Sequence, residues 1–106
     1  VLAEQAIALN PNNKEAIALL AYYYANLSNI ERTHFYAKKI SENDLGEDQF
    51  FIAAAYARLN MKKAALNYLA FAINNNYSVA EISTSPLFEN LKDKMKFKQL
   101  VNIDAK

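Results

Sequence analysis

Ala21-Tyr-Tyr-Tyr-Ala-Asn-Leu27 returns later in the chain in a looser form, as Ala53-Ala-Ala-Tyr-Ala-Arg-Leu59. Each residue of the second stretch lies 32 positions after its counterpart, as Tyr24 and Tyr56 do. A second series advances in steps of 33 residues, through Ile7, Ile40 and Ile73. Self-similarity at a fixed period of about 20 to 50 residues indicates a stacked-repeat fold. Such folds present extended binding surfaces, so the pattern favours a binding protein over an enzyme.

Apolar residues recur at helical spacing within and around these stretches. The spacing predicts helices over residues 2–9, 14–26, 30–40, 47–59 and 62–73. Asn10-Pro11-Asn12-Asn13 ends the first of them, because proline cannot continue a helix and asparagine tolerates turn geometry. Only two or three residues separate the helices within each later pair, so these neighbours are expected to pack antiparallel.

The composition agrees with this helical pattern and excludes several other classes. One glycine and two prolines leave little material for β-hairpins, and the absence of cysteine excludes disulfides and thiol chemistry. The 12 basic and 11 acidic residues give a net charge of +1, so no whole-chain field favours nucleic acid or anionic lipid. No apolar run reaches the roughly 18 residues that a membrane span needs.

Small and large residues alternate in the two full repeats as they do in the tetratricopeptide repeat (TPR) family, which this sequence resembles over residues 1–76. The second repeat carries the pattern without gaps, through Ala53, Tyr56, Ala65, Ala72 and Ile73. The first carries it through Leu20, Ala21 and Tyr24, although Thr33 replaces the expected alanine and the early tryptophan is absent.

The resemblance implies an all-α fold, a TPR-like superhelix of antiparallel helix pairs forming one domain over residues 1–106. Residues 1–13 would be the second helix of a truncated repeat, and 14–45 and 46–76 would be full repeats. Residues 77–106 would be a cap of two short helices, similar to segments that close many bacterial TPR arrays. Its apolar residues would cover the open face of the last repeat, through Phe88, Leu91, Phe97 and Leu100.

No set of residues indicates catalysis, a cofactor or a metal, and we expect none of the three. His34 is the only histidine, and its flanks offer no further ligand. The acidic cluster lacks the spacing of a calcium loop and is expected to favour the start of a helix, through Glu42, Asp44, Glu47 and Asp48. The lysines at 92, 94, 96 and 98 are too few for a phosphate-binding patch, so we expect no nucleic-acid and no membrane partner.

In the TPR family the first helix of each repeat lines a concave groove, which implies a partner-binding site here. The residues expected to line it are Glu15, Leu19, Tyr22, Asn26, Phe50, Phe51 and Arg58, with small neighbours Ala18, Ala25, Ala54 and Ala57. Only Asn26 and Arg58 suit a terminal carboxylate, so the groove is expected to hold an apolar helix or extended peptide on its aromatic anchors. Alternatively, Phe50 or Phe51 packs against a neighbouring repeat and anchors nothing.

The expected function is therefore that of a protein-interaction or scaffold module. Because the chain opens at Val1 inside a helical pattern, without methionine or signal peptide, we expect the C-terminal end of a larger bacterial protein. One alternative is a structural appendage that associates with itself through the N-terminal helix face, with Leu2, Ala3 and Ile7. Another, by family analogy, is the regulatory part of a transcription regulator or cyclase. The expected location is the cytoplasm, with the periplasm as the alternative.

Overall fold

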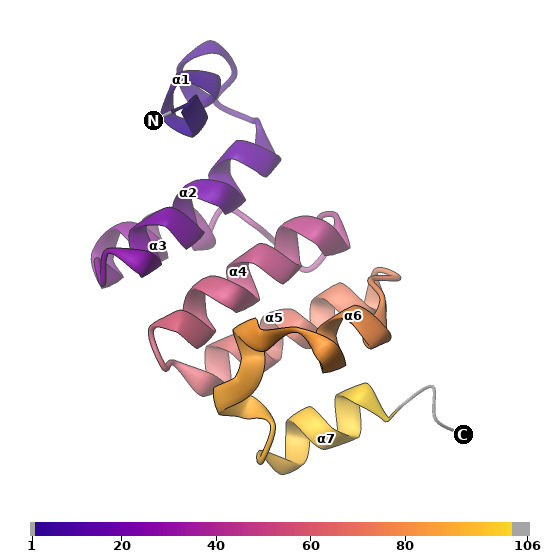
Figure 1. The fold of residues 1–106 in the computed structure, drawn as a ribbon. Coiled ribbons are helices and arrows are strands. Elements are labelled where there is room, and N and C mark those ends of the chain that lie inside the picture. The colour runs from indigo at the N-terminus through magenta and orange to yellow at the C-terminus, as the bar shows by residue number, and fades with distance from the viewer. Residues whose placement is uncertain (1, 103–106) are drawn as a thin grey trace.

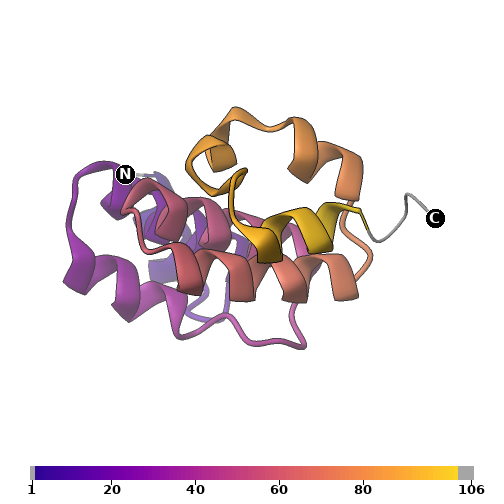
Figure 2. The ribbon, with the colours of Figure 1, turned by 90° about the horizontal axis from the view of Figure 1, so that it is seen from below.

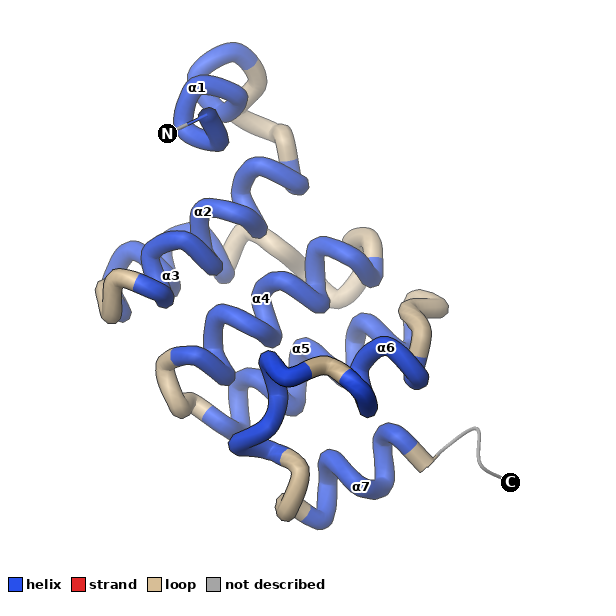
Figure 3. The backbone as a smooth tube through the Cα atoms, viewed as in Figure 1, coloured by secondary structure: helices blue, strands red, loops and turns tan. Residues whose placement is uncertain are grey.

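The computed structural model describes the backbone of residues 2–102, and the side chains from residue 5 onward except that of residue 6 (Figure 1). Over these residues the chain is helical and has no strand, as Figure 3 shows. The elements are α1 (Leu2–Leu9), α2 (Lys14–Asn26), α3 (Ile30–Ala37), α4 (Gly46–Arg58), α5 (Lys62–Asn74), α6 (Val79–Thr84), the 3₁₀ helix η1 (Pro86–Leu91) and α7 (Met95–Val101). The all-α prediction is confirmed.

Asparagine or serine side chains cap the start of four of these helices, the fourth being η1, where Ser85 Oγ accepts from the amide of Leu87. Asn13 Oδ1 accepts from the amide of Ala16 at α2, and Asn29 Oδ1 accepts from the amide of Arg32 at α3. Ser78 Oγ does the same for the amide of Glu81 at α6. Each bond satisfies an amide that has no partner within its own helix, so local sequence fixes where these helices start.

The turns between paired helices have the same backbone shape. Ser28, between α2 and α3, has φ 58°, and Asn60, between α4 and α5, has φ 60°. These two residues are 32 positions apart, so the sequence period is also a period of backbone conformation. Asparagine adopts this left-handed geometry at low cost, and Ser28 is the less usual choice.

The helix pairs form two layers. α2 packs against α4, and each first helix packs against its own partner, α2 on α3 and α4 on α5. Figure 2 shows α3 and α5 along one side of the molecule and α6 with η1 along the other. Alanines are buried where the helices approach, including Ala21 and Ala53, which are 0% exposed. Small side chains at these positions let the helix axes come close.

A tyrosine pair recurs within each helix pair. Tyr24 of α2 stacks on Tyr36 of α3, and Tyr56 of α4 stacks on Tyr68 of α5, both with ring centroids 5.9 Å apart. Both members are displaced by 32 positions from one pair to the next. The repeated letters of the sequence therefore correspond to a repeated packing unit.

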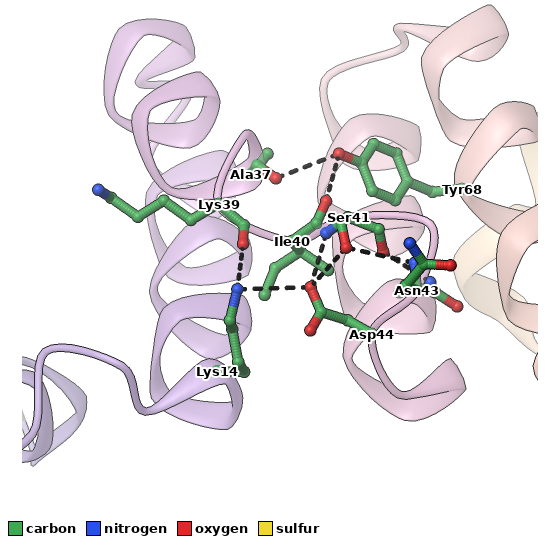
Figure 4. A network of polar contacts seen from close by, with 9 residues as sticks. Lys14, Ala37, Lys39, Ile40, Ser41, Asn43, Asp44 and Tyr68 are labelled. Carbon is green, nitrogen blue, oxygen red and sulfur yellow. Dashed lines mark hydrogen bonds and ion pairs between the residues drawn. The ribbon is translucent and has the colours of Figure 1, made fainter.

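The end of α3 differs from the sequence-based prediction, because the helix stops at Ala37 instead of Ile40. The amides of Lys39 and Ile40 bond the carbonyls of Tyr36 and Ala37, so the chain tightens into short turns there. Tyr68 Oη donates to the carbonyls of Ala37 and Ile40, at 3.1 and 3.0 Å, and so adds a second bond to the Ala37 carbonyl. A side chain from the next helix pair thus supplies hydrogen bonds to the backbone where the α-helical bonds of α3 end (Figure 4).

The C-terminal segment follows the same period as the helix pairs. First helices begin at Lys14, Gly46 and Val79, and second helices at Ile30, Lys62 and Met95. These starts are separated by 32 and then 33 residues in both series. Between α6 and η1, Ser85 is extended, with ψ 131°, and Pro86 follows it. The residue before a proline avoids helical geometry. Two short helices, α6 and η1, therefore stand where the period predicts the first helix of a third pair.

The predicted cap therefore contains three short helices instead of two. Its covering role is confirmed within the described residues, which end at 102. Phe88 and Leu91 are fully buried, Phe97 is 3% exposed, and Leu100 packs on the core. η1 contacts α4, and α7 contacts α5. The segment thus shields the second helix pair on the side away from α2 and α3.

Candidate partner-binding face

Five of the predicted groove residues lie on one face formed by α2 and α4, called here the α2–α4 face. Leu19 and Asn26 of α2 and Arg58 of α4 are exposed there, and Tyr22 and Phe51 are half-buried. Helical spacing places the three α2 residues along one side of that helix. The structure thus brings residues of both sequence copies to a common surface.

Two contacts cross from α2 to α4 on this face. The rings of Tyr22 and Phe51 meet edge to face, with centroids 6.3 Å apart. Near the other end of the helices, Arg58 Nε donates to Asn26 Oδ1 at 3.0 Å. Asn26 is itself held by a bond from its Nδ2 to the carbonyl of Tyr22.

This chain of contacts orients the Arg58 guanidinium. Arginine has five N–H donors, and only Nε–H bonds a described residue. The other four donors bond no described residue, and the half-buried rings of Tyr22 and Phe51 lie further along the same face. The face can therefore combine apolar contact with hydrogen bonds to carbonyl or carboxylate oxygens.

Phe50 corrects one part of the predicted groove. Its side chain is only 8% exposed, so it does not line an accessible surface. It stacks on Tyr77 with centroids 4.6 Å apart and meets the edge of Phe88 at 5.4 Å. The alternative, in which one of the two phenylalanines packs internally, holds for Phe50, although its cover is the C-terminal segment. Helical geometry explains the split, because adjacent helix positions point about 100° apart.

The small residues expected in the groove are also buried. Ala18, Ala25, Ala54 and Ala57 are each at most 3% exposed. They lie where α2 and α4 pack closely, so they set the distance between the helices and offer no surface to a partner. Glu15 is exposed in the first turn of α2.

Sequence reasoning missed Asn90. Its Nδ2 donates to the carbonyl of Ala57 and to Asn60 Oδ1, both at 3.0 Å. Asn90 lies 32 positions after Arg58, which lies 32 positions after Asn26. All three use a polar side chain to join the end of one first helix to its neighbour. The 32-residue period predicts a polar residue at each of these three positions. The helix break at Pro86 makes the third position, Asn90, hard to recognise in the sequence.

In the acidic turn before α4, the carboxylate of Asp44 is bonded by side-chain and backbone groups of the protein. Asp44 Oδ2 accepts from the amide and hydroxyl of Ser41 and pairs with Lys14 Nζ at 3.4 Å (Figure 4). Burial acts to raise the pKa of Asp44, but these hydrogen bonds and the Lys14 charge outweigh it and lower the pKa below 3.8. The turn therefore fastens the start of α2 to the start of α4.

Burial also shifts the pKa of two groups on α4, Asp48 and Tyr56. Burial raises the pKa of Asp48 above 3.8, and repulsion from neighbouring carboxylates adds to the shift. Burial, with a smaller effect of Tyr68, raises the pKa of Tyr56 to about 12. Tyr56 Oη lies 2.7 Å from His34 Nδ1, so the only histidine joins the two helix pairs.

No group of three potential metal-ligating side chains is found among the described residues. Within the same part of the chain, no helix is both long and apolar enough to cross a membrane. No protein-family model matches this chain, and neither a curated protein nor a solved structure is significantly similar to it.

Proposed function

We propose that the chain is a TPR-like interaction module that binds a peptide or helix of a partner protein on the α2–α4 face. The module would hold its partner without catalysing a reaction. The observation that carries the proposal is the pair of bridges between α2 and α4, the Tyr22–Phe51 edge contact and the Arg58–Asn26 hydrogen bond. They hold partly accessible aromatics and an oriented guanidinium on one surface.

The TPR-like arrangement is supported by the recurrence of structure at the sequence period. Helix starts, left-handed turn residues and stacked tyrosine pairs all repeat after 32 or 33 residues. Aromatic and arginine side chains supply a large share of the energy in protein interfaces. Tyr22, Phe51 and Arg58 are therefore the residues on which partner affinity should depend.

Selection of short random peptides on the immobilised protein tests the proposal. We expect enriched peptides whose affinity falls at least about tenfold on Tyr22→Ala or Arg58→Ala, as for truncated interface anchors. Tyr23→Ala is the matched control, because Tyr23 is the adjacent residue of α2, is 41% exposed, and contacts Tyr24 instead of α4. If no enriched peptide depends on Tyr22 or Arg58, the α2–α4 face is not the binding site.

The self-association alternative is tested separately. Ile7 is half-buried and packs on the core, whereas the side chains of Leu2 and Ala3 lie outside the described residues. Sedimentation of the protein alone over a range of concentrations decides the case. A dimer lost on Ile7→Asp would favour the appendage, and a monomer at all concentrations would reject it.

A further inference from the structure

Although the net charge is small, basic residues are concentrated in the second helix of each helix pair and acidic residues in the rest of the chain. Residues 30–39, 62–74 and 94–101, which hold the second helices α3, α5 and α7, carry eight lysines and arginines and a single carboxylate, Glu31. The other described residues from 5 onward carry three basic and eight acidic side chains. A net charge of +1 therefore results from two oppositely charged regions.

Two of these second helices lie side by side and form a common surface. α3 and α5 are joined by the bonds from Tyr68 Oη to the end of α3, and Figure 2 shows them in one layer. This surface, called here the α3–α5 face, carries Arg32, Phe35, Lys38, Lys39, Lys62 and Lys63, with Glu31 as its one carboxylate. All are exposed except Lys62, which is half-buried.

No cation of the α3–α5 face forms an ion pair with a described residue, although Glu31 lies on the same face. Two ion pairs join described residues, Lys14 with Asp44 and Lys92 with Glu89, and neither involves this face. Lys38 and Lys39 instead place their ammonium groups 5.5 and 4.7 Å from the centroid of the Phe35 ring. An exposed aromatic ring thus lies beneath two charges that have no anionic partner there.

An open hollow occurs at the same place on each of the two helices. One, of about 300 Å³, is lined by Asn29, Glu31, Arg32 and Phe35 of the α3 region. The other, of about 420 Å³, is lined by Met61, Lys62, Lys63, Ala64 and Asn67 of the α5 region. Four of the five α5 residues lie 32 positions after the four α3 residues. Each hollow combines apolar surface with at least one cation.

We propose that the α3–α5 face is a second docking surface, for an acidic polypeptide segment with apolar residues between its carboxylates. The carboxylates would pair with the lysines and Arg32, and the apolar side chains would enter the two hollows. Charge complementarity of this kind raises association rates and rejects basic competitors. The surface is separate from the α2–α4 face, so it does not depend on the function proposed above.

The hollows favour a polypeptide over a nucleic acid. A phosphate backbone would use the cations alone, and its affinity would rise with the number of neutralised phosphates. It would leave unused two hollows with apolar lining, one beside the exposed Phe35. A peptide has both kinds of side chain, at the spacing that an extended segment or a helix provides.

The peptide selection described above tests this surface when the enriched peptides are sorted by composition and by variant. We expect one class rich in Asp, Glu and apolar residues. On the triple variant Lys38→Glu, Lys39→Glu, Lys63→Glu, that class should lose affinity by at least about tenfold, because three attractive pairs become repulsive. Its affinity should be unchanged by Tyr22→Ala.

The matched control is Lys94→Glu, Lys96→Glu, Lys98→Glu, which makes the same change in net charge on α7. An effect of the local surface predicts at most about a threefold loss in this control, since charges beyond a Debye length are screened at about 0.15 M salt. Phe35→Ala removes the apolar wall of the first hollow without changing charge and should also weaken binding. Thermal melts would confirm that each variant is folded.

Three results would overturn the proposal. The first is the absence of any acidic class among the enriched peptides. The second is an equal loss of affinity in the α3–α5 and α7 variants, which would indicate a diffuse field. The third is tighter binding of a labelled single-stranded oligonucleotide, or of vesicles containing phosphatidylserine, that the α3–α5 variant abolishes, because the surface would then serve phosphates.

Discussion

The first helix pair, α2 with α3, and the second, α4 with α5, share a packing unit but not an environment. Tyr24 and Tyr56 make the same stacked contact within their pairs, yet Tyr24 is half-buried and Tyr56 is 6% exposed. The second pair is covered by α2 on one side and by the C-terminal segment on the other. In the first pair, α1 packs against α2, but the Tyr24 ring stays half-buried beneath the Arg32 guanidinium.

Position in the stack, more than local sequence, therefore decides how much each repeated residue contributes to stability. A buried side chain loses transfer energy and leaves a cavity when it is truncated, whereas an exposed one loses little. Paired substitutions at corresponding positions should therefore give unequal losses.

Phe88→Ala would weaken the packing of the C-terminal segment on the second helix pair. Phe88 is fully buried and meets the edge of Phe50, so its removal leaves a cavity under η1. We expect a loss of about 3–5 kcal/mol in the free energy of unfolding, measured by urea denaturation. Leu87→Ala is the control, because Leu87 is 37% exposed, and a comparable loss there would show that η1 itself was disrupted.

Tyr56→Ala and Tyr24→Ala compare the two pairs directly. We expect Tyr56→Ala to cost about 3 kcal/mol, because it removes a buried ring and its contact with His34. Tyr24→Ala should cost about half as much, since the ring is only half-buried. Equal losses in chemical denaturation would contradict the view that neighbouring helices set the difference.

Gly46→Ala tests the close approach of α4 to the end of α5. A Cβ at this position would lie 3.0 Å from the carbonyl oxygen of Ala72 and 3.2 Å from that of Asn75. Backbone atoms cannot move as a flexible side chain can, so overpacking should outweigh the better helix propensity of alanine by about 1 kcal/mol.

The corresponding position of the first pair provides the control for this change. Lys14 lies 32 residues before Gly46, and its ion pair with Asp44 is partly exposed. Lys14→Ala should therefore cost no more than about 0.5 kcal/mol. A larger loss for Lys14→Ala than for Gly46→Ala would mean that the acidic turn, and not helix contact, holds the two pairs in register.

Asp48→Asn and Asp44→Asn should have opposite effects that depend on pH. The pKa of Asp48 is raised, mainly by burial, so its ionised form destabilises the fold once the pH exceeds 3.8. Asp48→Asn should then raise the melting temperature at neutral pH. The gain is reduced by the loss of a favourable interaction between the carboxylate and the dipole at the start of α4. The gain should disappear as the pH falls below 3.8.

Asp44 provides the contrast, because its pKa is lowered. Its ionised form stabilises the fold above pH 3.8, and this stability is lost as the pH falls through its lowered pKa. Asp44→Asn should therefore lower the melting temperature at neutral pH and have little effect in acid. Thermal melts from acidic to neutral pH measure both variants, and shifts of the same sign would contradict the assigned environments.

Local signals in the sequence were sufficient for most of the fold. α2 has the predicted bounds because Asn13 caps its start and a turn follows its end. The predicted end of α3 was wrong because Tyr68, from the next pair, offers the terminal carbonyls a partner that local sequence does not reveal. The cap contains one helix more than predicted because Pro86 breaks a helix whose period continues.

The candidate surfaces were less predictable for a similar reason. Adjacent Phe50 and Phe51 look alike in sequence, and only the path of the C-terminal segment decides that Phe50 is covered. The lysines of the second helices are scattered along the chain, so their gathering depends on the stacking of α3 beside α5. Both outcomes arise from contacts between distant segments, which a residue's own neighbours do not encode.

The hydroxyl of Tyr68 has a consequence for how the molecule comes apart. It bonds the carbonyls of Ala37 and Ile40 at the end of α3, so this end has its full set of hydrogen bonds only while α5 is folded beside it. Stacks of this kind can lose their terminal units one at a time when neighbours are weakly coupled. Here backbone carbonyls of the first pair accept hydrogen bonds from Tyr68 of the second pair. The two pairs should therefore exchange their amide protons in a single cooperative opening, with no intermediate in which α5 has melted and α3 remains whole.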